Sequence, residues 1–238
     1  MPIDQNDLDL ANQISHVPLL GTLEAKVEPG HTALIVVDVQ NDFCAPGGMM
    51  AEEGFDVSPV QAMADRLPAL IATARAAGAL VVFIRNIYTS DGNVYLSDTW
   101  LEQASRARAG SYTRRDICRE GSWEGDFYGE VRPEPGDPLI VKHRFSAFHN
   151  TELDTVLRSH GIRTLVMTGV ASNVCVETTA REGFVRDYYI VFTADGTACY
   201  SDADHQATLR NIDRFFGQIT TVGELAAIWD GRAKQAAE

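Results

Sequence analysis

Six short runs of apolar, mostly β-branched residues recur along the chain, and their spacing limits the possible fold more than any other feature of the sequence. The first run, TALIVV, is continuous rather than alternating, which is typical of a strand buried on both faces of a sheet. Segments with helical patterns separate the runs, and such alternation indicates βαβ units. The sequence therefore predicts a three-layer α/β/α fold with a central, mostly parallel sheet. The predicted strands cover residues 32–37, 80–84, 138–141, 164–168, 189–193 and 218–221.

Start and stop signals mark the helices between these strands. Ser58, which precedes a proline, is expected to cap a helix that stops at Gly78. Pro68 inside this helix predicts a kink or a division into two shorter helices. Residues 151–154 have the form of a capping box, and Ser172 is expected to cap the helix that follows the fourth strand.

Two regions lack this alternation of strand and helix patterns. Residues 1–30 are polar and acidic and are expected to form an N-terminal arm before a single domain over residues 31–238. Residues 86–130 lack clear periodicity, and a segment of that length is usually a lid, a pocket wall or an oligomer contact. The alternative is that this segment is a long surface loop without a function of its own. The segment carries four clustered basic residues, Arg106, Arg108, Arg114 and Arg115.

Composition excludes several classes of protein. The formal net charge of the 238 residues is −13, and nucleic-acid binding needs a cationic face instead. No apolar run approaches the roughly 18 residues of a membrane span, and the first residues lack the basic start of a signal peptide. The four cysteines form no C-x-x-C pair, so we expect free thiols and no structural zinc site. Free thiols, together with the lack of a membrane-spanning run and of a signal peptide, predict a cytoplasmic protein without membrane contact.

Three residues with chemical potential follow three different predicted strands. Asp38 follows the first strand, Lys142 follows the run PLIV, and Cys175 lies just past the run TLVMT. Ligands of an open parallel sheet bind beyond the carboxyl ends of its strands, where all three residues are expected to meet. Each residue alone has a plain structural explanation, such as a turn or a solvated side chain. Their common edge of the sheet predicts a catalytic group.

Cys175 is the expected nucleophile of this group. If Ser172 is the N-cap, Cys175 is the third helical residue, where the helix dipole and Lys142 would lower the thiol pKa. Asp38 is then expected to take the thiol proton and return it to the leaving group. The backbone N–H groups of Ala171 and Cys175 are expected to form an oxyanion hole. A buried structural cysteine at a tight turn is the alternative.

The sequence resembles the isochorismatase-like cysteine hydrolases over residues 32–229. The resemblance rests on D-x-Q-N-D-F at Asp38, K-x-x-x-S-x-F at Lys142 and G-V-A-S-N-V-C-V-E-T-T at Cys175. It implies the same Asp–Lys–Cys triad and a cis peptide bond between Val170 and Ala171. The superfamily includes nicotinamidases, N-carbamoylsarcosine amidohydrolases, biuret and triuret hydrolases and ureidoacrylate amidohydrolases.

Within this superfamily the sequence is most similar to ureidoacrylate amidohydrolases, in stretches such as RAAGALVVFIRN and NVCVETTAREGF. Nicotinamidases carry a metal-binding D-x-H motif where this chain has Asn86-Ile87-Tyr88, so no metal and no cofactor are expected. Isochorismatases proper lack the nucleophilic Cys that this chain has at position 175. The resemblance implies cysteine-dependent hydrolysis of a small linear ureide, with biuret, triuret or N-carbamoylsarcosine as alternative substrates. A catalytically silent interaction module is a less favoured alternative.

The resemblance also implies residues around the substrate. Asn86 and Tyr88 would line the pocket with amide and phenol groups suited to a ureide. Arg144 and the arginines of residues 106–115 are candidates for binding a substrate carboxylate, and members of the family usually form homo-oligomers. Three aromatic residues are expected either to form the apolar walls of the pocket or to belong to the core: Phe43, Phe145 and Phe148.

Overall fold

The chain folds around one sheet of six parallel strands. The computed structural model describes residues 4–107 and 114–237. The strand order is β3-β2-β1-β4-β5-β6, and every neighbouring pair is parallel, which confirms the predicted α/β class. The order reverses between β1 and β4, and an open sheet of this kind has its binding crevice at that switch point. The strands are β1 Thr32–Val37, β2 Leu80–Asn86, β3 Leu139–Lys142, β4 Thr164–Val170, β5 Tyr189–Ala198 and β6 Gln218–Thr220.

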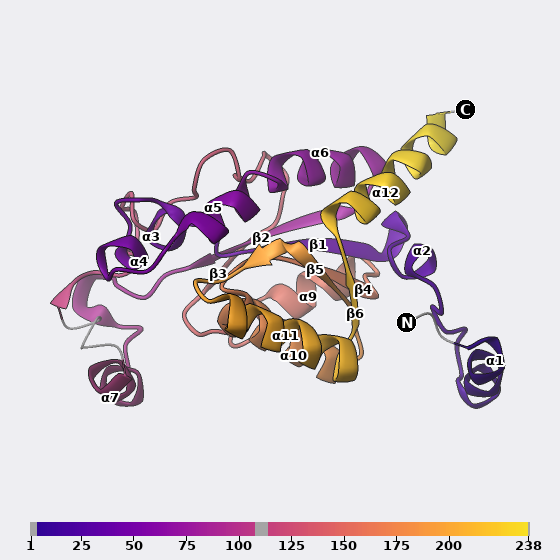
Figure 1. Ribbon diagram of the computed structural model, residues 1–238, viewed down its shortest axis with the longest axis horizontal. Helices are drawn as coiled ribbons and strands as arrows, with labels where there is room; N and C mark the ends of the chain where they lie inside the picture. Colours follow the sequence, from indigo (N-terminus) through magenta and orange to yellow (C-terminus); the bar gives the residue numbers. More distant parts are fainter. Residues whose placement is uncertain (1–3, 108–113, 238) are drawn as a thin grey trace.

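Helices cover both faces of the sheet, as Figure 1 shows. One layer contains α5 Ser58–Ala64, α6 Leu67–Ala77 and α12 Val222–Ala237, and the opposite layer contains α9 Leu153–Ser159, α10 Glu177–Val185 and α11 Asp202–Phe215. Short helices occupy the connections. They are α2 Leu23–Lys26, η1 Pro29–His31, α3 Asn41–Cys44, α4 Met49–Glu52, η2 Asp91–Asn93, α7 Asp98–Ala107 and the π-helical turn η3 Ser172–Val176.

The central strand explains why the chain forms two cores. All six residues of β1 are completely buried. Because successive side chains of a strand point to opposite faces, Leu34 and Val36 enter the core under α5, α6 and α12, whereas Ile35 and Val37 enter the other. Each buried aliphatic side chain contributes about 1.5–3 kcal/mol, which makes β1 the anchor of the sheet.

The helix predicted from residue 58 is in fact two helices, α5 and α6, and Pro68 lies in the first turn of the second. Gly78 ends α6 in the left-handed conformation, with φ of 87°, as expected of a glycine after a helix. Ser58 is not the cap that the sequence predicts. It is the first helical residue, and its backbone N–H donates to the carboxylate of Asp56 at 2.9 Å.

The start of the helix near residues 151–154 also differs from the predicted capping box. The helix α9 begins at Leu153, and Glu152 is its N-cap without a side-chain cap. The Thr151 hydroxyl accepts from the Leu153 amide at 3.3 Å and donates to the backbone of the preceding loop. Thr151 therefore fixes the loop before the helix more than it caps the helix itself.

The residues expected to form an N-terminal arm divide into two parts. Residues from 22 onward pack on the domain, where Val27 is completely buried and its carbonyl accepts from the Trp229 indole at 2.8 Å. Residues 4–21, here called the projecting arm, include the helix α1 Gln5–Ile14, which has no buried residue and stands away from the sheet (Figure 1). Of the helices in the described ranges, none is long and apolar enough to cross a membrane.

Candidate active site

Three βα units bring Asp38, Lys142 and Cys175 together at the carboxyl edge of the sheet. Asp38 is the residue after β1, Lys142 is the last residue of β3, and Cys175 lies in the η3 turn after β4. Asp38 has a φ of 51°, in the left-handed region that Asp adopts more readily than bulkier residues. Asp38 and Cys175 flank the switch point between β1 and β4, and Lys142 reaches it from the edge strand.

Lys142 is the centre of this group. Its Nζ lies 2.6 Å from Asp38 Oδ2 and 3.3 Å from Cys175 Sγ. It also donates to the backbone carbonyl of Arg144 at 3.1 Å, so the ammonium has three polar neighbours. The Asp38 carboxylate is held by this ion pair and by an interaction with the Cys175 thiol, and neither of its oxygens accepts a well-angled hydrogen bond from the described residues. The carboxylate is thus held by charge and has lone pairs free for a proton.

Burial is the largest influence on the pKa of each of these groups. It raises the pKa of Asp38, although the Lys142 ammonium opposes this. Burial would lower the pKa of Lys142, but its interactions with Asp38 and then with Cys175 outweigh this, and the pKa is raised. The pKa of Cys175 is raised to about 12 by burial and by Asp38, against the attraction of Lys142. The substrate-free site therefore holds a neutral thiol beside a charged ammonium.

The environment of Cys175 differs from the sequence prediction in two ways. Ala171, not Ser172, precedes the helical turn, so Cys175 is its fourth residue rather than its third. The Ser172 hydroxyl is fully buried and contacts His205 Nδ1 at 2.9 Å instead of capping the turn. The prediction of a lowered thiol pKa is wrong for this substrate-free site, because the loss of water around the sulfur outweighs the favourable charge nearby.

The turn between β4 and η3 is narrow. The peptide bond between Val170 and Ala171 is cis, as the family resemblance implies. Gly169 before it has φ of 104°, and a Cβ there would lie 2.1 Å from the carbonyl oxygen of Val37 in β1. Only glycine fits this close approach of the two central strands. The Ala171 carbonyl accepts from the amides of Val174 and Val176, which closes the turn around Cys175.

Gln40 fixes the loop that carries Asp38. Its side-chain oxygen accepts from the Asn86 amide at 2.8 Å, and its nitrogen donates to the carbonyls of Asn86 and Gly125 at 3.0 and 2.8 Å. One buried side chain thus joins the end of β1 to the end of β2 and to a loop 85 residues further on. Gln40 is part of the D-x-Q-N-D-F motif at Asp38, but no role for its side chain was predicted from the sequence.

The Asn86 side chain is the strongest candidate for a substrate contact. Asn86 is completely buried, and neither its Oδ1 nor its Nδ2 has a hydrogen-bond partner in the described part of the chain. It is paired with Lys142 in the β2–β3 register, so both side chains point to the same face of the sheet. A buried amide without partners costs free energy unless a ligand satisfies it. Its position beside the lysine agrees with the predicted substrate-binding role.

The isochorismatase domain model matches residues 32–224, which is most of the chain. The chain belongs to the isochorismatase family. Ureidoacrylate amidohydrolase RutB of Methylobacterium radiotolerans is 39% identical to it, over 82% of this chain and 78% of that protein. The protein of the same name from an Enterobacter species is 38% identical, over 85% of this chain and 93% of that protein. The chain is therefore an isochorismatase-family hydrolase, and amide hydrolysis is the activity named for these relatives.

Solved structures of the isochorismatase family share the fold. A cysteine hydrolase from Pseudomonas syringae pv. phaseolicola has a TM-score of 0.75 and 28% identity, and the match covers 92% of this chain and all of that one. The N-carbamoylsarcosine amidase of Thermoplasma acidophilum has a TM-score of 0.63 at 24% identity, with 81% of this chain and 96% of that one covered. The second likeness concerns the fold alone.

In this family member a small apolar cluster lies next to the triad. Here we call residues 88–107 and 114–119 the covering segment, because they pack on the loops that follow β1 and β3. Trp100 in α7 lies between Tyr88 and Phe145, with ring centroids 5.8 and 4.7 Å away. Phe43 joins the same cluster from the Asp38 loop. Tyr88, Phe43 and Phe145 thus meet in one apolar cluster, and their role in lining a substrate pocket stays a prediction. Trp100 is an aromatic neighbour that the sequence analysis did not single out.

Two predicted substrate contacts lie elsewhere. Phe148 packs against Tyr188 and α10 in the core, so the alternative interpretation as a core residue holds for it. The Arg144 guanidinium donates to the carbonyls of Tyr95 and His143 and lies over the Trp100 ring, 5.2 Å from its centroid. Arg144 therefore holds the covering segment in place, and its backbone, not its charge, contacts Lys142.

Two of the clustered arginines of residues 106–115 are paired, whereas Arg114 is exposed and has no ion-pair partner among the described residues. Arg106 pairs with Glu102 in its own helix, and Arg115 pairs with Glu52. Arg108 lies outside the described residues. In the described ranges, no group of three or more His, Cys, Asp or Glu side chains is placed to hold a metal ion.

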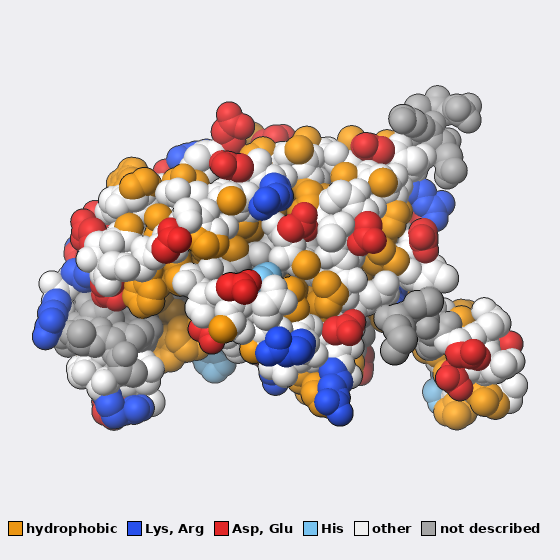
Figure 2. Space-filling view, in the orientation of Figure 1, with side chains coloured by type: hydrophobic (Ala, Val, Ile, Leu, Met, Phe, Trp, Pro, Cys, Tyr) orange, Lys and Arg blue, Asp and Glu red, His pale blue; other side chains and the backbone are white. Residues whose placement is uncertain are grey.

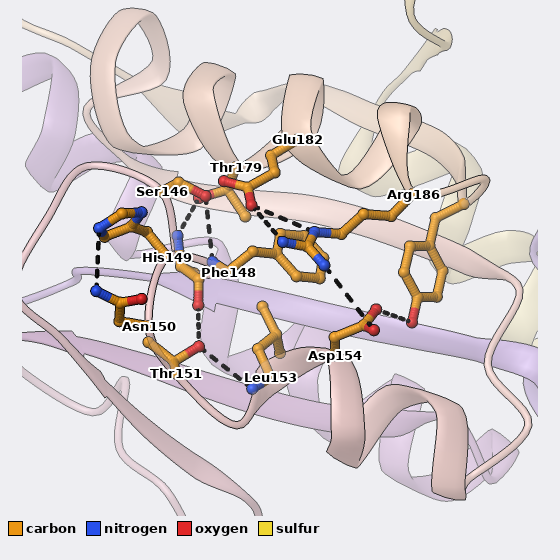
Figure 3. Close-up of polar contacts among 12 residues, drawn as sticks. Ser146, Phe148, His149, Asn150, Thr151, Leu153, Asp154, Thr179, Glu182 and Arg186 are labelled. Atoms are coloured by element: carbon orange, nitrogen blue, oxygen red, sulfur yellow. Dashed lines mark hydrogen bonds and ion pairs between the residues drawn. The ribbon is translucent and has the colours of Figure 1, made fainter.

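Thr179 connects the strand end that carries Lys142 to the helix that follows Cys175. Its hydroxyl accepts from the Ala147 amide at 3.0 Å and donates to the Cys175 carbonyl at 2.7 Å. Figure 3 shows Thr179 on α10 beside the loop of Ser146 and Phe148. Thr179 is completely buried, so both bonds are shielded from water. No local pattern in the sequence indicates this role, because Ala147 lies 32 residues before Thr179 along the chain.

Further along α10 the same loop and helix are held by charged groups. Arg186 donates to Glu182 and also approaches the carboxylate of Asp154 in α9, as Figure 3 shows. The Tyr188 hydroxyl donates to Asp154 at 2.9 Å. This network packs the loop after β3, α9 and α10 into one unit beneath the candidate site.

Proposed function

We propose that the protein is a cysteine-dependent amidohydrolase that cleaves a small linear ureide of the ureidoacrylate type. The observation that carries the proposal is the contact of one buried ammonium, that of Lys142, with both Asp38 and Cys175. The kinship with ureidoacrylate amidohydrolases supports the substrate class. A catalytically silent module would have no need for an ion pair buried beside a thiol, because burying two charges is costly.

The first step forms a carbamoyl-enzyme. Substrate R–NH–CO–NH2 enters beside Cys175, and the sulfur attacks the carbonyl carbon as the thiol proton passes to Asp38. The raised pKa of Asp38 suits this role, because a carboxylate of higher pKa is a stronger base. Asp38 then gives the proton to the departing nitrogen, the C–N bond breaks, and R–NH2 leaves. Lys142 stays charged throughout and balances the negative charge that moves between Asp38 and sulfur.

The second step releases the enzyme. Water attacks the carbonyl of the thiocarbamate, Asp38 takes a proton from this water and returns it to the sulfur, and carbamic acid leaves and ionises to carbamate. Carbamate then decomposes to carbon dioxide and ammonia. In both steps the carbonyl oxygen becomes negative, and the backbone N–H groups of Ala171 and Cys175 are the proposed donors to it.

The polar end of the substrate is assigned to Asn86. A ureide presents both N–H donors and a C=O acceptor, and the unpartnered side chain of Asn86 offers the complementary pair. Tyr88, Phe43 and Phe145 would enclose the rest of the substrate. The same arrangement suits biuret, triuret and N-carbamoylsarcosine, which remain the alternative substrates.

Parallel assays of ammonia release test the proposal. Wild-type protein is incubated with ureidoacrylate, biuret, triuret, N-carbamoylsarcosine and nicotinamide, together with Cys175→Ala and the control Cys199→Ala. Cys199 is a buried cysteine that is not part of the triad, and its thiol donates to the Ser201 carbonyl. We expect turnover of one ureide that is lost in Cys175→Ala and kept in Cys199→Ala. Activity retained by Cys175→Ala would contradict the covalent route, and hydrolysis of nicotinamide alone would contradict the substrate class.

The Arg144→Gln variant separates charged from uncharged substrates. If Arg144 binds the carboxylate of ureidoacrylate, KM for that substrate rises and KM for biuret does not. If Arg144 only holds the covering segment, through its bonds to the Tyr95 and His143 carbonyls, both values change together.

A further inference from the structure

The projecting arm exposes apolar side chains that a globular domain would normally bury. In α1 and just after it, Leu10, Ile14 and Val17 are 58%, 82% and 59% exposed. Leu10 and Ile14 are four residues apart, so they lie on one face of the helix. An apolar helix face that meets no part of its own domain needs a partner surface.

Contacts at the base of the arm hold it away from the domain. The Leu20 amide donates to the Tyr189 hydroxyl at 3.2 Å, and Arg163 reaches the Pro18 carbonyl at 3.4 Å. Beyond these two anchors, α1 stands clear of the sheet and its helical layers (Figure 1). The arm thus leaves the domain at the start of β5 and presents its apolar face outward.

A second exposed apolar surface lies at the ends of α10 and α11. We call Phe184, Val185, Phe215 and Phe216 the apolar patch. The ring centroid of Phe216 is 5.6 Å from that of Phe184 and 6.2 Å from that of Phe215, so the aromatic rings are continuous. Val185 is 76% exposed and Phe215 is 58% exposed.

The charges around the two surfaces are complementary. No Lys or Arg precedes Lys26 in the chain, whereas Asp4, Asp7 and Asp9 lie in or beside α1. The patch is bordered by arginines instead. Arg214 lies over the Phe215 ring, and neither it nor Arg210 has a carboxylate partner within the described ranges. In Figure 2, acidic side chains accompany the apolar ones on the arm, whereas both basic and acidic side chains lie beside them over α10 and α11.

We infer that the projecting arm of one copy of the chain docks on the apolar patch of a second copy. Leu10 and Ile14 pack on Phe215 and Val185, and the aspartates of α1 meet the free arginines of α11. Because each copy carries both surfaces, the exchange is reciprocal and closes a two-fold dimer. Acidic and basic borders of this kind fix the orientation of the arm and favour encounter between copies.

Disulfide trapping tests this contact directly. A tagged chain with Ile14→Cys is mixed with an untagged chain with Val185→Cys under mild oxidation. The background is low, because the four native cysteines are all buried. The matched control replaces Val185→Cys with Val94→Cys, an equally exposed valine outside the patch. We expect a mixed disulfide with Val185→Cys and none with Val94→Cys.

Light scattering of the full chain provides the second measurement. Wild-type protein is expected at twice the mass of one chain, and Leu10→Ser with Ile14→Ser is expected to raise the dimer dissociation constant at least about tenfold. The change Val94→Ser, which removes an exposed apolar side chain outside the arm and the patch, is the control and leaves the mass unchanged. Three outcomes would overturn the inference: a monomeric wild-type protein, a dimer that the arm variants do not weaken, or a disulfide that forms only within a chain carrying both cysteines.

Discussion

The carboxyl edge of the sheet and the covering segment above it are built by different means. At the edge, Asp38 and Lys142 are completely buried and paired, each at the end of a strand that the core fixes. In the covering segment, charged contacts lie at the surface, and the Asp91 carboxylate that pairs with Arg119 is 99% exposed. Buried contacts persist because water cannot replace them, whereas exposed ion pairs contribute little. The residues at the carboxyl edge of the sheet are therefore held in fixed positions, whereas the covering segment is suited to adjust to a bound substrate.

The largest expected effect follows from Asp38→Asn. This change keeps the shape of the side chain but removes the proton acceptor, and we expect ammonia release from the preferred ureide to fall by about 10²–10⁴-fold. The exposed counterpart, Asp91→Asn in the covering segment, should leave the rate nearly unchanged. Steady-state rates of both variants check the prediction, and equal losses would contradict the contrast between the two regions.

Loss of folding is a separate effect in Asp38→Asn, because Lys142 remains as a buried charge without its partner. Removing one member of a buried pair typically costs about 3–5 kcal/mol. The double variant Asp38→Asn with Lys142→Met removes both charges and should recover most of the thermal stability without recovering turnover. If turnover returned together with stability, Asp38 would be a structural residue only.

The second prediction concerns the thiol of Cys175, whose pKa is raised to about 12 in the substrate-free protein. Only the thiolate reacts with iodoacetamide, so the alkylation rate should rise about tenfold per pH unit from about pH 7 to about pH 9. Mass spectrometry of the modified peptide measures this rate, and Cys175→Ala gives the background. A plateau below about pH 8 would mean that the resting site already holds a thiolate, which would contradict burial as the main influence on its pKa.

Much of the candidate site at the carboxyl edge can be predicted from the sequence, because local sequence patterns determine the strands that carry its residues. The run TALIVV predicts a buried strand, and β1 has the predicted bounds, Thr32–Val37. Three strands with a polar residue at their carboxyl ends then predict the meeting of Asp38, Lys142 and Cys175. The family resemblance adds the cis bond after Val170.

Contacts between distant segments could not be predicted in this way. Ser172 has the composition of a cap, but its hydroxyl is taken by His205 from a helix about 30 residues later, which no local pattern indicates. The strand β5 continues to Ala198, past the Asp195-Gly196 pair that suggests a turn, because β4 offers hydrogen-bond partners there. The thiol pKa also depends on burial by the whole fold.

A third, smaller effect is expected at Thr179, which connects the two halves of the edge. Thr179→Val keeps the shape but leaves the Ala147 amide and the Cys175 carbonyl without their partner, which costs about 1–3 kcal/mol in unfolding free energy. We also expect kcat to fall more than KM rises, because the backbone carbonyl of the nucleophile Cys175 loses the hydrogen bond from the Thr179 hydroxyl. Thr179→Ser restores the hydroxyl and should recover kcat. If Thr179→Ser lost as much kcat as Thr179→Val, the hydroxyl bonds would not account for the effect, and Thr179 would have no positioning role.

The smallest effect is expected where the covering segment is held by exposed charges. Arg119 contacts Asp91 at 2.6 Å and Asp116 at 3.0 Å, and the two carboxylate side chains are 99% and 55% exposed. Arg119→Gln should therefore change the unfolding free energy by about 1 kcal/mol or less, and added salt should reduce the difference further. Urea unfolding at low and high ionic strength measures it against Thr179→Val. A loss as large as that of Thr179→Val would show that the covering segment is fixed as firmly as the strand ends, and substrate selection would then have to lie in the shape of the pocket rather than in movement of this segment.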